Sequence, residues 1–82
     1  MWREEDNKLK ARFIFKDFIS AFSFMASVAL AAEKMDHHPN WFNSWNIVEI
    51  ELCTHSAGNT ITDKDKNLAE KISAIYLTYH RE

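Results

Sequence analysis

The sequence predicts an α+β domain with the element order strand, strand, helix, strand, helix. Two segments, 17–35 and 62–80, have apolar residues at helical spacing, and two others, 8–15 and 45–54, have apolar residues that alternate with charged ones. The 82 residues are 46% hydrophobic, which is enough for the core of one domain spanning residues 1–82. A domain of this size buries only about 60–65% of its unfolded surface, so oligomerisation would add stability.

The first strand is predicted at residues 8–15, because its apolar residues share one parity and mostly charged residues lie between them. These apolar residues are Leu9, Phe13 and Phe15. Residues 2–6 can pair with this strand through a turn at Asp6-Asn7, since both residue types favour turns.

The first helix is predicted to begin after Asp17, a suitable N-cap residue, and to run to about Met35. Pro39 prevents any continuation, because it disfavours a helical conformation at His38. The apolar stretch inside this helix has only 15 residues, whereas a membrane span needs about 20. We therefore expect a core helix and no membrane partner. Its predicted core stripe consists of Phe18, Phe22, Met25, Ala29 and Ala32, and Phe24 and Val28 widen the apolar face.

The second half of the chain predicts a strand, a loop and a helix. In the strand 45–54, Ile50 and Leu52 alternate with two glutamates, so one face is expected to be in water. Trp45 is expected in the core, and Cys53 is expected to be buried and inert. A loop around Gly58 follows. The helix then begins at Thr62-Asp63-Lys64-Asp65, which has the form of a capping box, and its apolar stripe consists of Leu68, Ile72, Ile75, Tyr76 and Tyr79.

The net charge and the cysteine content limit the binding partners and the compartment that we expect for this protein. The net charge is −2 and no basic stripe is present, which argues against direct nucleic-acid binding. A single cysteine excludes an internal disulfide and favours a reducing compartment, the cytoplasm and also the nucleus. The first residues are too charged for a signal peptide.

The most informative feature is a group of three histidines. His37 and His38 lie in the exit loop of the first helix, and His55 follows a strand end. Imidazole titrates close to neutral pH, so histidines that meet in one pocket can move protons. Together with the flat apolar walls that Trp41, Phe42 and Trp45 would supply, they predict an acid/base pocket for a flat heteroaromatic substrate.

Plainer interpretations compete with this one. Three histidines can also hold a catalytic zinc ion. The His37-His38-Pro39 spacing, however, matches no known arrangement of zinc ligands, so we predict no metal. Asp65 can serve only as a helix cap, and Trp41 only as a core residue. A single surface histidine is usually inert, and His80 needs no role beyond its favourable position at a helix C-terminus.

These residues carry a resemblance to a known family. The run Glu33-Lys34-Met35-Asp36-His37-His38-Pro39-Asn40-Trp41-Phe42-Asn43, the later pair Thr54-His55 and the run Asp65-Lys66-Asn67-Leu68-Ala69 resemble the motifs of the pterin-4a-carbinolamine dehydratases. The resemblance extends from about Trp2 to the end of the chain. The family pattern usually has a further helix before the position of Trp2, and the loop 55–65 is one residue longer here.

The resemblance implies a fold and an activity. The fold would be an antiparallel four-stranded sheet with helices on one face, in which the missing strand is residues 2–6 or a segment near Ile61. The activity would be the removal of water from 4a-hydroxytetrahydropterin to give quinonoid dihydropterin, in tetrahydrobiopterin recycling, without metal or organic cofactor.

The resemblance also implies residue roles. His37, His38 and His55 would be the catalytic acid/base residues. The substrate-binding residues would include Pro39 and Trp41, which shapes the pocket. Two carboxylates would complete this group: Glu33, which orients His37, and Asp65, which supports the site from the second helix.

Two kinds of protein partner follow from the resemblance. Members of the family form homodimers that extend the sheet and homotetramers that pair through helices. Some also bind the dimerisation segment of a homeodomain transcription factor. A protein-binding scaffold of this kind is the alternative function, and it would not require intact histidines.

Overall fold

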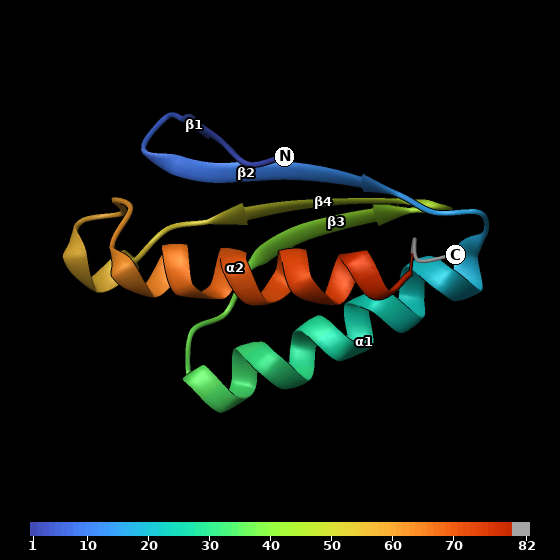
Figure 1. Cartoon of the computed structure of the whole chain (residues 1–82). Coiled ribbons are helices and arrows are strands. Elements are labelled where there is room, and N and C mark those ends of the chain that lie inside the picture. The colour runs from blue at the N-terminus through green and yellow to red at the C-terminus, as the bar shows by residue number, and fades with distance from the viewer. Residues whose placement is uncertain (80–82) are drawn as a thin grey trace.

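Two helices cover one face of a four-stranded antiparallel sheet in the computed structural model, which describes residues 1–79 (Figure 1). The sheet order is β1-β2-β4-β3. The predicted fold class is therefore confirmed, while His80 lies outside the described residues. In chain order the elements are β1 (Arg3–Glu5), β2 (Lys8–Ile14), α1 (Phe18–Met35), β3 (Asn40–Ser44), β4 (Ile47–Leu52), a 3-10 turn (His55–Ala57) and α2 (Asp63–Thr78).

The strand that the sequence patterns missed is β3, which pairs with β4. Of the two places offered for a missing strand, residues 2–6 contain β1, whereas the region near Ile61 contributes only an isolated bridge between Thr54 and Thr60. The predicted hairpin of β1 and β2 is confirmed. Its turn residues, Asp6 and Asn7, have φ values of 55° and 61°, which short polar side chains tolerate better than others.

The two faces of the sheet differ sharply because side chains alternate along each strand. On the helix side, apolar pairs such as Phe13 and Val48 lie opposite each other and are fully buried. On the open side, charged pairs such as Arg12 and Glu49 lie opposite each other, with 3.7 Å between Nε and Oε2. This alternation is the one predicted for strands with one face in water.

The buried face of α1 agrees only in part with the predicted apolar face. Ala21, Phe24, Val28 and Ala32 are buried, whereas Phe18 and Phe22 are exposed. The expected core stripe is therefore wrong at these phenylalanines. The reason is that α1 is apolar on nearly all sides, so spacing alone does not identify the face that packs on the sheet.

The unburied side of α1 leaves large apolar side chains in solvent. Ile19 and Leu30 are each 76% exposed. By length and composition alone α1 would suffice to cross a membrane, with a mean hydropathy of 1.3 over 18 residues. In the fold its inner face belongs to the core, as predicted.

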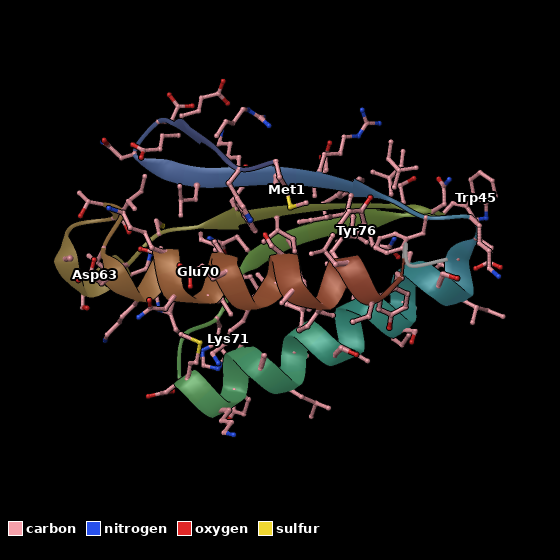
Figure 2. The ribbon with its side chains drawn as sticks, in the orientation of Figure 1. Met1, Trp45, Asp63, Glu70, Lys71 and Tyr76 are labelled. Carbon is pink, nitrogen blue, oxygen red and sulfur yellow. The ribbon has the colours of Figure 1, made fainter. Side chains whose placement is uncertain are left out.

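Trp45 is a second correction. It was expected in the core, but it lies in the β3–β4 turn with φ of 49° and is 65% exposed. Figure 2 shows it at one end of the molecule, far from Asp63 at the start of α2. The turn takes its shape from Asn43, whose Nδ2 donates to the carbonyl oxygen of Ile47 at 2.8 Å.

Aromatic rings join α2 to the sheet. The Tyr76 ring, which Figure 2 shows between α2 and the sheet, lies edge-on to Phe13 with 4.8 Å between centroids. Trp2 packs on Phe13 and donates from Nε1 to Oγ of Ser73 at 2.8 Å. The predicted apolar stripe of α2 is confirmed, with Leu68 and Ile72 fully buried.

We predict that Phe24→Ala lowers the free energy of unfolding by about 3–5 kcal/mol, because it removes a fully buried ring and leaves a cavity. Urea denaturation followed by circular dichroism measures this change. Lys34→Ala, on an exposed position of the same helix, is the control and should change stability by less than about 0.5 kcal/mol. Equal effects of the two substitutions would contradict the assigned packing face of α1.

Candidate active site

The exit of α1 determines where the two adjacent histidines point. Asp36 takes a left-handed conformation with φ of 54°, and the backbone N–H of His37 donates to the carbonyl oxygen of Ala32 at 3.1 Å. This cap reverses the chain. As a result the side chain of His37 turns inward and is 11% exposed, while that of His38 turns outward and is 57% exposed.

A fully buried carboxylate, that of Asp65, is the hydrogen-bond partner of His37. Asp65 lies in the first turn of α2, and its Oδ1 is 2.6 Å from Nε2 of His37. Its Oδ2 accepts a hydrogen bond from the backbone N–H of Thr62 at 2.8 Å, which completes the predicted capping box. Asp65 therefore caps α2 and contacts the histidine at the same time. The C-terminal end of α1 and the N-terminal end of α2 lie at the same end of the molecule (Figure 1).

Thr54 is a site residue that the sequence patterns did not single out. It is buried just after β4, and its hydroxyl donates to Oδ2 of Asp65 at 2.8 Å. The Thr62 hydroxyl lies 2.6 Å from the Thr54 hydroxyl oxygen and donates to it, since the Thr54 proton is already used. The only sequence signal was its place beside His55 in the Thr-His motif.

These contacts keep Asp65 ionised. Burial by itself raises the pKa of a carboxyl group, but hydrogen bonds from His37, the Thr62 backbone and Thr54 outweigh it. The pKa of Asp65 is therefore lowered below its ordinary value of 3.8. At neutral pH a negative charge thus lies in the protein interior, directly behind the His37 ring.

The other two histidines have different partners. Nε2 of His38 lies 2.8 Å from Oε1 of Glu33, and this pair is exposed. The expectation that Glu33 orients His37 is therefore wrong, because the chain reversal at Asp36 turns His37 away from α1. Nδ1 of His55 lies 2.6 Å from Oδ1 of Asn59, in the loop that follows β4.

All three histidines line one pocket of about 320 Å³. Pro39, a predicted substrate-binding residue, also lines it, whereas Trp41, which was expected to shape the pocket, does not. Trp41 is half-buried against the core, because β3 directs its side chain to the helix side of the sheet. The pocket is lined by Asp36, His37, His38, Pro39, Asn40, Cys53, Thr54, His55, Ser56 and Lys64.

The arrangement is suited to proton transfer. One nitrogen of each ring faces an oxygen acceptor, and within residues 1–79 the other nitrogen makes no hydrogen bond. Among residues 1–79, no group of three or more His, Cys, Asp or Glu side chains is arranged to hold a metal ion. The chemistry that these residues themselves offer is general acid and general base catalysis.

Comparison with known proteins adds family relationships. The family model described as pterin 4 alpha carbinolamine dehydratase matches residues 1–75. A Brucella ovis protein that provisionally carries the name pterin-4-alpha-carbinolamine dehydratase is 49% identical over 76 residues, which are 90% of this chain and 77% of that protein. Proteins of Brucella canis and Brucella suis with the same provisional name match equally well.

Two solved structures share the fold. One is the crystal structure of a transcriptional coactivator/pterin dehydratase from Brucella melitensis, with a TM-score of 0.87 and 48% identity over 92% of this chain and 81% of the other. The second is a pterin dehydratase-like protein identified as a RuBisCO assembly factor in the alpha-carboxysome. It has a TM-score of 0.78 and 23% identity over 92% of this chain and 88% of the other, so it supports the fold alone.

The lowered pKa of Asp65 predicts acid sensitivity. A carboxyl group whose pKa is lower in the folded state adds stability above its unfolded pKa, and this contribution is lost as pH falls through the folded pKa. Stability should therefore decline as pH falls below about 3.8. Asp65→Asn should lose about 2–3 kcal/mol at neutral pH and decline less steeply in acid. Chemical denaturation at a series of pH values tests this, and parallel curves for the two proteins would contradict it.

Proposed function

Because this chain belongs to the pterin 4 alpha carbinolamine dehydratase family, we propose that it removes water from a 4a-hydroxytetrahydropterin by histidine acid/base catalysis. The observation that carries this proposal is the meeting of His37, His38 and His55 around one pocket. Its volume of about 320 Å³ is in the range of small-molecule sites, which begins near 300 Å³.

The reaction requires two proton transfers. An acid protonates the 4a-hydroxyl group, which leaves as water when its C–O bond breaks. A base takes the proton from ring N5, and the electrons of that N–H bond form the new C=N bond of quinonoid dihydropterin. No net oxidation or reduction occurs, so the reaction needs no redox cofactor. Two imidazoles with free ring nitrogens can perform both transfers.

The partners of the rings suggest a division of roles. The ionised carboxylate of Asp65 stabilises a positive charge on His37, which suits the proton donor. His55 faces a neutral amide, which suits the ring that begins uncharged and accepts a proton. His38 lies with Glu33 on the exposed side, where it can bind the substrate or exchange protons with water.

An assay with synthetic 4a-hydroxytetrahydropterin tests the activity. The wild-type protein should accelerate dehydration over buffer, and His38→Ala should lose most of that acceleration. His37→Ala and His55→Ala should each lose about 10²–10⁴-fold, the usual contribution of a general acid or base. Lys66→Ala, at an exposed position beside Asp65 in sequence, is the control and should keep full activity. No acceleration by the wild type would refute the dehydratase function.

We also propose that a second copy of the chain pairs along β3. The two edges of the sheet differ: β1 is only three residues long and entirely charged, while β3 is five residues long and uncharged. Charges protect an edge strand against pairing, and their absence leaves β3 open to it. Phe42, on this edge, is 59% exposed.

For this dimer we predict that Phe42→Lys shifts the protein toward the monomer in sedimentation equilibrium, because a lysine introduces charge repulsion across the shared edge. Glu4→Gln changes the net charge by the same amount at the β1 edge and should leave the association unchanged. A wild-type monomer at high concentration would remove the proposal.

A protein-binding role is the second candidate, and the exposed apolar side of α1 favours it. Ile19, Phe22 and Leu30 are all exposed on this helix. Several large apolar side chains exposed on one element are typical of interaction surfaces, whereas single exposed apolar residues are common on any protein. The related Brucella melitensis protein is described as a transcriptional coactivator as well as a pterin dehydratase. A pull-down with an immobilised dimerisation segment of a transcription factor tests this role. If the beads retain none of the wild-type protein, the role is excluded.

A further inference from the structure

We propose that Asn59 is a positioning residue that fixes the tautomer and orientation of His55. This inference rests on the acid/base function proposed above and concerns one contact, the 2.6 Å separation between Asn59 Oδ1 and His55 Nδ1. Asn59 lies outside the pocket lining, so it would act on the substrate only through the histidine.

The chemistry of the two groups determines which ring nitrogen carries the proton. An amide oxygen only accepts hydrogen bonds, so Nδ1 of His55 must be the donor. In the neutral ring Nε2 then has a free lone pair that can accept a proton. His37 and His38 are arranged the opposite way, since both are bonded through Nε2 and their Nδ1 atoms make no hydrogen bond to the described residues. His55 thus differs from them in its free nitrogen and in the neutrality of its partner.

The neutrality of that partner has a consequence for the reaction. A carboxylate beside an imidazole stabilises the protonated ring, as Asp65 does for His37. An amide orients the ring equally well and adds no such charge. Asn59 therefore holds His55 in the geometry of a dyad without placing a charge beside the ring.

The loop that carries both residues is closed by its own backbone hydrogen bonds. The N–H of Asn59 donates to the carbonyl oxygen of Thr54 at 3.0 Å, and the N–H of Gly58 donates to that of His55 at 3.1 Å. The N–H of Thr54 in turn donates to Thr60 at 2.8 Å. His55 and Asn59 thus belong to the same short loop, four residues apart, and contacts within this loop are enough to bring their side chains together.

Asn59 also has a plain structural use, which a test must separate from its effect on His55. Its φ is 60°, next to Gly58 at 82°, and asparagine is one of the few side chains that tolerate this region. Asn59→Gly keeps the backbone conformation and removes the amide. Asn59→Asp keeps an acceptor at the same place and adds a negative charge. Asn59→Gly therefore tests the hydrogen bond without disturbing the turn. Asn59→Asp tests the effect of an added charge without removing the hydrogen bond.

The first measurement is nitrogen NMR of the histidine rings, with no substrate present. In the wild type His55 should show a proton on Nδ1 and a free Nε2 in the neutral form. Asn59→Gly should shift the ring toward the other tautomer, and Asn59→Asp should keep the proton on Nδ1. A wild-type His55 with its proton on Nε2, or no change in Asn59→Gly, would overturn the inference whether or not the protein is a dehydratase.

The second measurement is the pH profile of dehydration. Asn59→Gly should lower kcat by about tenfold, by analogy with the lower end of the loss when the hydrogen-bond partner of a metal-bound histidine is removed. Asn59→Asp should move the limb that requires an uncharged base to higher pH, because the new carboxylate favours the protonated ring. Unchanged kcat and pH profiles in both variants would overturn the inference. An inactive wild type with the expected NMR signals would instead refute the proposed function.

Discussion

The hydrogen-bond network of Asp65 is the interaction on which the site depends. A buried carboxylate is unfavourable unless its oxygens are bonded, and here His37, Thr54 and Thr62 supply the donors. These residues come from the exit of α1, the segment after β4 and the start of α2. One side chain therefore fixes the relative positions of three separate elements. The same contacts place the pocket where those elements meet.

The double use of Asp65 links stability to chemistry. A capping residue needs only to bind the first turn of its helix, and an exposed aspartate would do so without burial. Asp65 also places an ionised group behind His37, where water is excluded and the charge is little screened. The carboxylate that caps α2 is thus the same group that contacts the His37 ring.

The three histidines are distinguished by their partners more than by their positions. His37 has a buried carboxylate, His38 an exposed one and His55 an amide. Solvent weakens the exposed pair, so the rings experience three different electrostatic surroundings within one pocket. Such a gradation allows neighbouring rings of equal intrinsic basicity to take different roles in one reaction.

The sequence alone determined those features that depend on short-range order. Alternation predicted the buried and exposed faces of β2 and β4, and the capping box located the start of α2, because these patterns follow from local backbone geometry. The histidine motifs indicated a single pocket, and the resemblance indicated the family. The exit loop at Pro39 followed from the restriction that proline places on the preceding residue.

Only the tertiary structure decided which face of α1 is buried, whether residues 40–44 form a strand and which side chains pair in the site. The apolar surface of α1 extends around the helix, so packing against the sheet selected Phe24 and left Phe22 exposed. β3 emerged because β4 offered a partner for a segment with only a weak pattern of its own. The pairing of His37 with Asp65, which leaves Glu33 to His38, depended on the meeting of the exit of α1 with the start of α2. Spacing along the sequence does not specify such directions, because they are set by contacts that form only when the elements pack together.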